Sequence, residues 1–329
     1  MALATVKSAA EWVERFGESR KPTVVTIGNF DGVHLGHKKI LSGVRERARA
    51  ADLMAAVLTF YPHPSRVLRP EVAPALLATL KQRLAAFDAA GLDAALVMQF
   101  DTELAKVSAE DFVQRYLVEI LRARAVMVGG NFRFGHRQLG DVKLLEELGR
   151  RWNFEVHVVP PVVIDGVIVS SSAVREALRE GRVEEAARLL GRPFALEGEI
   201  QPGTGQGRHL IVPTLNLATE QEFLPKNGVY ATQAVVQGKT YQSATNIGMR
   251  PTFNGTRLAI ESHLFGFNEN LTSGRMEIRF HARLRDEQKF ASPEALKEQV
   301  LKDIERAREY FRKNLTTDPS TPLGASEHR

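Results

Sequence analysis

The sequence predicts two domains of different architecture: a Rossmann-like α/β domain, then an antiparallel all-β domain with a terminal helix. The chain has 329 residues, which is long for a single hydrophobic core. Apolar runs first alternate with helical periodicity, and later become short, closely spaced runs separated by turn residues. We place the first domain at 1–183 and the second at 184–314, and we expect 315–329 to be a disordered tail.

Continuous apolar runs favour a parallel sheet in the first domain, because strands covered by helices on both faces are apolar throughout. Ligands of such sheets bind at the carboxyl ends of the strands. The loops after Ile27, Phe60, Val128 and Val169 are therefore the expected site. The predicted strands are 24–27, 55–60, 94–98, 125–128 and 154–159, with helices at 37–50, 80–90, 109–122 and 142–152.

A predicted helix at 182–190, followed by Gly191 and Pro193, separates the two architectures. From 194 to 284, turn pairs such as Gln237-Gly238 divide short strands, a pattern typical of an antiparallel barrel or sandwich. The periodicity then predicts a last helix at 293–314.

Composition narrows the function classes. The chain has no cysteine, which excludes disulfides, thiolate catalysis and cysteine-ligated zinc. It shows no signal peptide and no apolar stretch of membrane-spanning length, so we expect a cytoplasmic protein without membrane contact. The formal net charge of +5 is compatible with nucleic acid, but basic and acidic residues are mixed and no aromatic platform accompanies them. We therefore expect no nucleic-acid partner.

The segment from Gly28 to His37 carries the first candidate site. It follows the first apolar strand and leads into a helix, and Gly28, Gly32 and Gly36 allow tight turns and close approach to a ligand. His34 and His37 share one face if the helix begins there. Two histidines at a helix N-terminus can bind phosphate, since the helix end adds backbone N–H groups and partial positive charge. A metal pair or a purely structural turn is the alternative.

Together with three later segments, this HxGH motif resembles the nucleotidyltransferase superfamily. More closely, the four resemble the FAD synthetase module of the prokaryotic bifunctional riboflavin kinase/FAD synthetase family. They occur in the family's order within the first 180 or so residues. The later three are Thr59-Phe60-Tyr61-Pro62-His63-Pro64, Val128-Gly129-Gly130-Asn131-Phe132-Arg133-Phe134-Gly135 and Ser170-Ser171-Ser172-Ala173-Val174-Arg175.

The resemblance implies roles for these residues in FMN adenylylation. His34 and His37 would hold the ATP phosphates and stabilise charge on the α-phosphate, with Asn131 as a catalytic positioner. Phe134 would form an aromatic wall for the isoalloxazine ring. Asn131 as a turn residue and Phe134 as a core residue remain alternatives. The implied ATP-binding residues are Gly28, Phe30, Gly32, Ser170, Ser171, Ser172 and Arg175.

The second half contains no Walker-type phosphate loop, but it has glycines at 203, 205 and 207 followed by Pro213-Thr214-Leu215-Asn216. Gly203, Gly205 and Gly207 could direct N–H groups at phosphates, and Thr214 and Asn216 carry oxygen ligands suited to Mg²⁺. The run matches the riboflavin kinase PTxN motif, and this resemblance implies that the three glycines, Thr214 and Asn216 bind ATP. Further riboflavin kinase matches occur at 227–230, 244–253, 260–264 and 284–290.

The kinase resemblance implies that Glu261 is the general base for the riboflavin 5′-hydroxyl, and that Arg285 binds the flavin or its phosphate. A surface salt bridge is the alternative for Arg285. Overall, the resemblance implies conversion of riboflavin to FMN and FAD with ATP as co-substrate and Mg²⁺ as cofactor. Riboflavin, FMN, FAD and ATP would be the ligands, and a homo-oligomer is left open. Departures at 210–212 and 264–274 leave an alternative, an FMN adenylyltransferase with a weak or flavin-binding-only kinase module.

Overall fold

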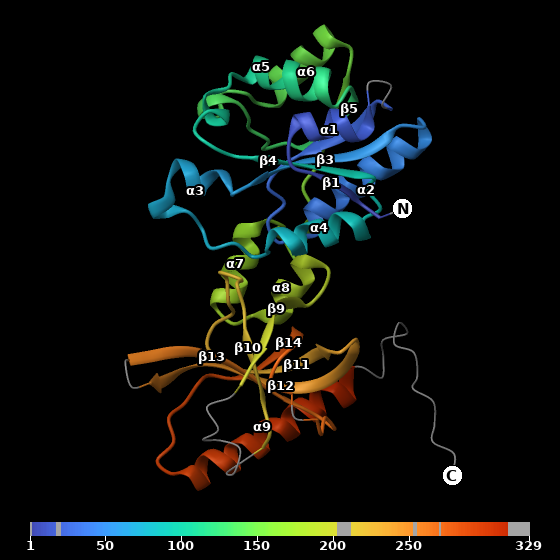
Figure 1. Ribbon diagram of the computed structural model, residues 1–329. Coiled ribbons are helices and arrows are strands. Elements are labelled where there is room, and N and C mark those ends of the chain that lie inside the picture. The colour runs from blue at the N-terminus through green and yellow to red at the C-terminus, as the bar shows by residue number, and fades with distance from the viewer. Residues whose placement is uncertain (1, 18–20, 203–211, 253–254, 270, 315–329) are drawn as a thin grey trace, which may run out of the picture. The chain divides into compact units, whose positions relative to one another are not determined.

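The structure is a computed structural model that describes residues 2–17, 21–202, 212–252, 255–269 and 271–314 (Figure 1). The chain divides into two compact units, Met1–Ala173 and Val174–Arg329. The first unit is built on a parallel sheet and the second on a closed antiparallel barrel. The predicted fold class is therefore confirmed. The predicted tail at 315–329 lies outside the described residues.

Six parallel strands form the sheet of the first unit, in the order β1-β4-β3-β2-β5-β6. Continuous apolar sequence explains the parallel pairing: β2 is buried along its whole length, and Ile27 pairs with Leu58 of β3. The strands are β1 (Ala4–Val6), β2 (Thr23–Ile27), β3 (Met54–Tyr61), β4 (Ala94–Gln99), β5 (Ala123–Gly129) and β6 (Glu155–Val159).

Helices cover both faces of this sheet (Figure 1). On one face, Leu41 and Phe87 belong to the same apolar cluster as strand residues. On the other face, Trp12, Leu117 and Leu145 pack in a second cluster. The helices are α1 (Ala9–Phe16), α2 (Leu35–Ala50), α3 (Pro64–Leu68), α4 (Leu80–Ala89), α5 (Ala109–Phe112), the π-helix η3 (Val113–Ile120) and α6 (Val142–Trp152), with 3₁₀ turns η1 (Pro70–Val72), η2 (Leu104–Lys106) and η4 (His136–Gln138).

The strand order reverses beside β2. From β2 the chain moves to β3 and then β4 on one side, whereas β5 and β6 lie on the other side of β2. Helices that leave neighbouring strands in opposite directions open a crevice at the strands' carboxyl ends, which is where α/β sheets bind ligands. The loops after β2 and β5 therefore flank the switch point, and both are among the loops where the sequence analysis expects the site.

The second unit is a six-stranded closed barrel in the order β10-β13-β12-β11-β14-β9. Alternate residues point inward, and four inward hydroxyls of Thr232, Ser243, Thr245 and Ser262 form a buried hydrogen-bonded chain. The strands are β9 (Phe194–Gln201), β10 (Leu215–Ala218), β11 (Gly228–Val236), β12 (Lys239–Thr252), β13 (Gly255–Leu264) and β14 (Arg275–Arg285).

Among the described residues, the second unit also contains the helices α8 (Val183–Leu190) and α9 (Pro293–Asn314), and α7 (Ser171–Arg179) belongs to it from Val174 onward. The predicted helices at 182–190 and 293–314 correspond to α8 and α9. Along α9, Ile304, Ala307 and Phe311 pack on small residues of the barrel wall, among them Ala231 and Ala244. This packing fixes α9 across the outer face of β11, β12 and β14.

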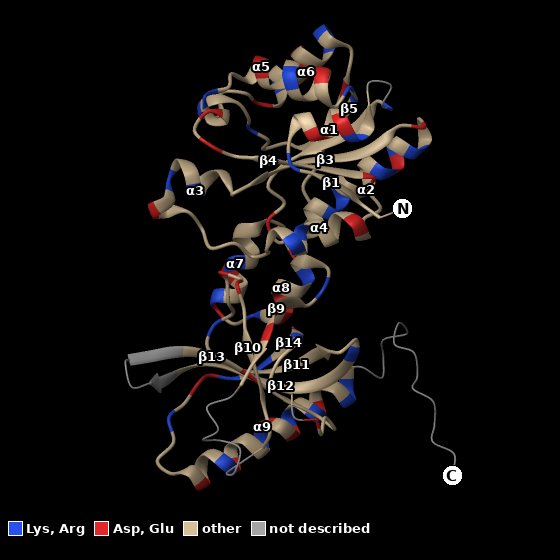
Figure 2. Cartoon of the chain, viewed as in Figure 1, with Lys and Arg blue, Asp and Glu red and all other residues tan. Residues whose placement is uncertain are grey.

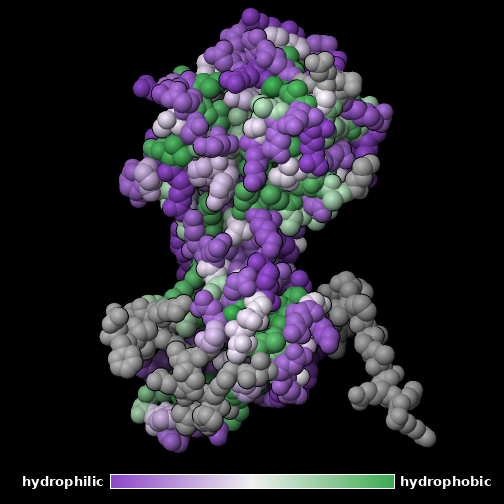
Figure 3. All heavy atoms as spheres, viewed as in Figure 1, coloured by the Kyte–Doolittle hydropathy of each residue, from purple (hydrophilic) through white to green (hydrophobic). Residues whose placement is uncertain are grey.

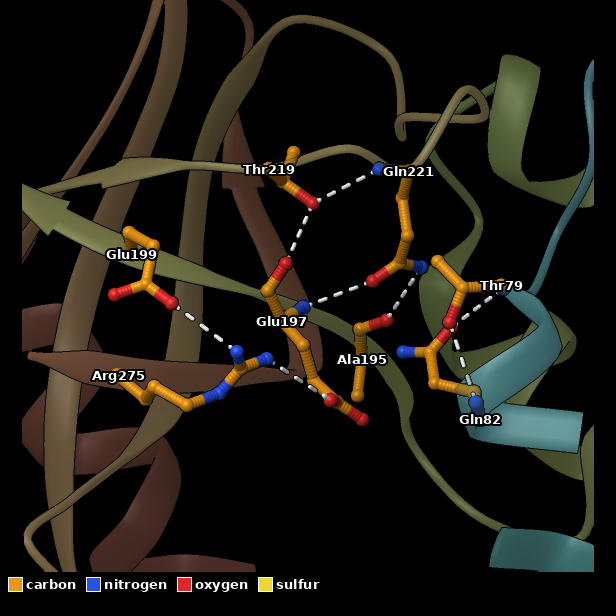
Figure 4. Close-up of polar contacts among 8 residues, drawn as sticks. All are labelled: Thr79, Gln82, Ala195, Glu197, Glu199, Thr219, Gln221 and Arg275. Atoms are coloured by element: carbon orange, nitrogen blue, oxygen red, sulfur yellow. Dashed lines mark hydrogen bonds and ion pairs between the residues drawn. The ribbon is translucent and has the colours of Figure 1, made fainter. Parts of the chain in front are cut away.

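Side chains complete the barrel where β10 is too short to pair with the start of β9 (Figure 4). The amide of Gln221 accepts from Glu197 N–H at 2.8 Å and donates to the carbonyl of Ala195 at 3.1 Å. Thr219 donates to the Glu197 carbonyl at 2.6 Å. These side chains provide hydrogen-bond partners for the backbone groups at the start of β9 that β10 does not reach. Buried backbone groups without partners would destabilise the fold.

Several short elements had no clear sequence signal. These are β1, α1, α3 and the small hairpin of β7 (Val163–Ile164) and β8 (Val167–Ile168). A three-residue strand such as β1 is shorter than the periodicity that would reveal it, and its pairing with β4 supplies its stability.

The surface chemistry is mixed. Lys and Arg lie among Asp and Glu along the helices rather than in one stripe (Figure 2), and hydrophilic residues cover most of the face shown in Figure 3. Within the described ranges, no helix combines the length and apolar composition needed to cross a bilayer.

Candidate active sites

A tight turn after β2 begins the first site. Phe30 adopts a positive φ of 52° and buries its ring edge-on against Phe87, with ring centres 5.3 Å apart. A Cβ at Gly28 would lie 3.3 Å from the Phe30 ring, so glycine gives the ring room. Gly32 has a φ of 78°, which favours glycine. The turn therefore leads the chain directly into α2.

His34 and His37 meet at the start of α2. His34 is the N-cap residue, and its Nδ1 accepts from the backbone N–H of His37 at 3.4 Å. The two rings stack with centres 3.7 Å apart. A Cβ at Gly36 would lie 3.1 Å from Cε1 of His34, so the missing side chain makes space for this stacking. The predicted shared face is thus observed.

Electrostatics make His37 neutral near pH 7. Burial and the adjacent His34 lower the pKa of His37 well below its usual 6.5. Its Nδ1 is enclosed and, among the described residues, has no hydrogen-bond partner. The N-terminus of α2 adds partial positive charge. A phosphate arriving here would stabilise the charged imidazole and raise its pKa.

Ser171 connects a distant segment to this turn. Its hydroxyl donates to the backbone carbonyl of Asp31 at 2.9 Å, although the two residues are 140 positions apart. Ser170 accepts from the N–H of Ala173 at 3.2 Å at the start of α7. The structure therefore brings Ser170 and Ser171 to the histidine turn, and Ser172 follows within the first turn of α7.

Two buried charged residues hold the turn, and the sequence reading did not identify either. The carboxylate of Asp31 accepts from the N–H groups of Leu77 and Ala78, at 3.0 and 3.1 Å to Oδ1. Arg83 is only 2% exposed, and its Nη1 donates to the Asn29 carbonyl at 2.7 Å and to the Thr59 hydroxyl at 3.3 Å.

Arg83 carries a buried charge near the proposed phosphate site. Burial lowers its pKa, an effect that Asp31 and Tyr61 oppose. It projects from α4, whose first turn is fixed by a capping box between Thr79 and Gln82 (Figure 4). In the sequence, Arg83 resembles any basic residue on a helix, so only the fold reveals its position.

The loop after β5 places Asn131 and Phe134 differently. Asn131 is exposed, with its Oδ1 3.2 Å from where a Cβ of Gly129 would lie. Phe134 is 7% exposed and packs in the core, stacked on Phe132 at 5.3 Å. The flavin-wall role of Phe134 therefore stays a prediction, and this packing matches the alternative of a core residue. Arg175, also buried, lies in α7 within the second unit.

The second candidate site is a pocket of about 300 Å³ between the outer barrel face and α9. Its polar lining includes Thr214, Asn246, Glu261, His263 and Arg285. Its apolar lining comes mainly from the segment before α9 and from α9 itself, and comprises Val212, Val229, Ala244, Phe290, Leu296, Val300 and Ile304. The lining also includes Glu287, Gln288 and Asp303, so the pocket combines polar groups with apolar surface on both walls.

Strand register brings the predicted kinase residues together. Glu261 pairs with Asn216 of β10 on one side and with Asn246 of β12 on the other. Directly paired residues of antiparallel strands point to the same face, and Thr214 precedes Asn216 by two positions. Glu261 is 9% exposed. A carboxylate therefore lies beside a hydroxyl and an amide oxygen, a set of hard oxygen donors that fits Mg²⁺.

His263 fixes the backbone next to Thr214, which the sequence reading did not foresee. Its Nδ1 lies 2.8 Å from the Pro213 carbonyl, so the ring donates a hydrogen bond to that oxygen. The contact joins β13 to the segment before β10 and restrains the position of Thr214. The predicted phosphate-binding Gly203, Gly205 and Gly207 lie outside the described residues.

Arg285 lines the pocket, but its guanidinium already has a partner. Its Nε and Nη2 donate to Oδ2 of the buried Asp303 in α9, at 2.9 and 2.7 Å. Gln299 also donates to Asp303, at 2.9 Å. This ion pair ties α9 to the end of β14. The carboxylate that binds Arg285 is buried, so the pair is not the surface salt bridge that the sequence left open. A flavin contact of Arg285 stays a prediction.

Glu287 secures the same segment on β12. Its Oε1 accepts from the N–H of Met249 at 3.1 Å, and its Oε2 accepts from the Asn227 amide at 3.3 Å. A Cβ at Gly248 would lie only 2.1 Å from Oε1 of Glu287. Gly248 is therefore required for the carboxylate to reach the strand backbone.

Comparison with known proteins follows the same division of the chain. The family model described as FAD synthetase matches residues 17–173, and the one described as riboflavin kinase matches residues 190–311. A bifunctional riboflavin kinase/FMN adenylyltransferase of Pseudomonas fluorescens is 40% identical over 286 residues, covering 87% of this chain and 92% of the relative. The same-named protein of Escherichia coli K12 is 37% identical over 289 residues, covering 88% and 92%.

One solved structure has the same fold over most of the chain. It is described as a macrolide-efflux protein from Streptococcus pneumoniae, with a TM-score of 0.81 and 25% identity. The match covers 95% of this chain and 99% of that one.

Proposed function

This chain belongs to the bifunctional riboflavin kinase/FMN adenylyltransferase family, and we propose that its two units phosphorylate riboflavin to FMN and adenylylate FMN to FAD. ATP is the co-substrate of both steps. The observation that carries the proposal is that each unit has its own polar site, one at a helix N-terminus and one beside a barrel carboxylate. We further propose catalytic domains at 1–183 and 184–314.

In the adenylyl transfer, a phosphate oxygen of FMN attacks the α-phosphorus of ATP and pyrophosphate leaves. His34, His37 and the N–H groups at the start of α2 would stabilise the negative charge that develops on the phosphate. Ser170, Ser171 and Ser172 would hold the leaving pyrophosphate, since Ser171 is joined to the same turn. Asn131, Gly28, Phe30, Gly32 and Arg175 complete the proposed set. Geometry of this kind contributes through charge stabilisation and positioning.

In the kinase step, Glu261 would take the proton of the riboflavin 5′-hydroxyl as that oxygen attacks the γ-phosphorus of ATP, and ADP leaves as the bond from the γ-phosphorus to its bridging oxygen breaks. Thr214 and Asn216 would hold Mg²⁺ next to Glu261. The ion, when bound, neutralises charge on the phosphates. Asn216, one of the proposed ligands, pairs in register with Glu261 on the neighbouring strand, which supports a joint role of the two residues.

Paired product assays on the full chain test the proposal. Riboflavin with Mg-ATP should give FMN, and FMN with Mg-ATP should give FAD and equimolar pyrophosphate. Formation of FAD without any phosphorylation of riboflavin would favour the alternative, an adenylyltransferase whose second unit only binds flavin. Absence of both products would refute the proposal.

A further inference from the structure

A continuous row of paired residues crosses five strands of the barrel. Register pairs Asn216 with Glu261, Glu261 with Asn246, Asn246 with Val229, and Val229 with Arg285. Since directly paired residues share a face, all five point outward, and all but Asn216 line the pocket beneath α9. The strand register therefore fixes the order in which these side chains follow one another along the pocket.

The two ends of this row differ in chemistry. At one end, Asn216 and Glu261 are the proposed metal ligand and base. At the other end, Arg285 follows Val229 and is held by Asp303, with the Phe290 ring next to its guanidinium. Phe290, together with Leu296 and Val300 of α9, supplies apolar lining. An aromatic ring is stabilised by apolar contact, and a phosphate is not. A phosphoryl acceptor that combines a reactive hydroxyl with a flat ring would lie along the row. Its hydroxyl would be at Glu261 and its ring near α9.

Asn246 occupies the middle of that path. It is half-buried, and among the described residues its side-chain amide makes no hydrogen bond. Its Nδ2 lies 3.3 Å from where a Cβ of Gly248 would be, so glycine leaves space beside the amide. Neighbouring strands are about 4.8 Å apart, so about 10 Å separates Glu261 from Val229, enough for an extended five-carbon chain.

We propose that Asn246 binds a secondary hydroxyl of the acceptor's polyol chain, and thereby makes the kinase selective for a polyhydroxylated alcohol. This inference rests on the proposed riboflavin kinase function. An amide suits the role because it can both donate to and accept from a hydroxyl. A site built to hydrogen-bond a substrate hydroxyl discriminates against the analogue that lacks it.

The test compares two acceptors that differ only in the chain. Riboflavin carries secondary hydroxyls, whereas a flavin with a 5-hydroxypentyl chain has the same primary alcohol without them. Phosphorylation of each is measured as kcat/KM at saturating Mg-ATP, for the natural protein and for Asn246→Ala. We expect Asn246→Ala to lower kcat/KM about tenfold for riboflavin and less than about twofold for the 5-hydroxypentyl flavin. The KM for ATP should not change.

Gln242→Ala is the matched control, since Gln242 is an exposed amide on the same strand and face that does not line the pocket. It should leave the discrimination intact. Equal losses for both acceptors in Asn246→Ala, or a raised KM for ATP alone, would overturn the proposal.

Asn246→Ser provides a second variant if the alanine variant no longer melts cooperatively. Its shorter side chain should also lose discrimination, and full retention would overturn the proposal. A natural protein that phosphorylates neither acceptor would instead refute the kinase function itself, and the role of Asn246 with it.

Discussion

Replacing Arg83 with methionine tests how much the buried guanidinium supports the phosphate-binding turn. Arg83 donates to the Asn29 carbonyl at 2.7 Å and to Thr59 at 3.3 Å, so the change removes both bonds while roughly filling the space. A hydrogen bond from a charged donor contributes about 1.5–3 kcal/mol. If about 2 kcal/mol of this free energy stabilises the transition state of adenylyl transfer, its loss lowers the rate of FAD formation from FMN about 30-fold. FMN formation from riboflavin should be unchanged.

The assay follows FMN and FAD separately by chromatography, with each flavin supplied in turn. Lys81→Met is the matched control, because Lys81 is an exposed cation two residues away in α4. Arg83→Lys keeps the charge and one donor, and it should recover part of the lost rate. An Arg83→Met rate within about threefold of the natural protein would refute this account, as would equal loss of both activities.

Three further predictions concern single positions. Gly36→Ala should lower FAD formation about tenfold without loss of stability, because the new Cβ would lie 3.1 Å from the His34 ring while alanine favours the helix; an unchanged rate would contradict this. Gly248→Ala should lower FMN formation only, because its Cβ would displace Glu287, and product assays with each flavin check it. Burial and Arg279 lower the pKa of His281 to about 4, below its usual 6.5. The neutral His281 therefore contributes its full share to the free energy of unfolding above pH 6.5, and about 3 kcal/mol of that free energy should be lost as the pH falls to about 4. Urea unfolding at several pH values should show this loss, and His281→Gln should abolish this pH dependence.

The sequence predicted the architecture because the relevant signals are local. Continuous apolar runs marked the parallel strands, and the terminal helix was predicted at its observed bounds, Pro293–Asn314. The glycine spacing around His34 and His37 likewise reflects local geometry, since Gly36 borders the His34 ring directly. Such features depend on residues a few positions apart, so a sequence pattern can reveal them.

Contacts between distant residues could not be predicted in this way. Ser171 reaches Asp31 across 140 positions, and Arg83 reaches Asn29 across 54. The partnership of Arg285 with Asp303 also needs α9 to be placed on the barrel before it can be seen. Phe134 illustrates the same limit, because its motif does not show whether the ring faces a ligand or the core.

Mixing two variants tests most directly whether the units carry separate reactions. His37→Ala should convert riboflavin to FMN and stop there, whereas Glu261→Gln should convert supplied FMN to FAD but leave riboflavin unchanged. Combined in one tube with riboflavin and Mg-ATP, the two variants should restore FAD formation, because FMN released by one is used by the other. Loss of both activities in either folded variant, or no FAD from the mixture, would contradict the assignment of one reaction to each unit.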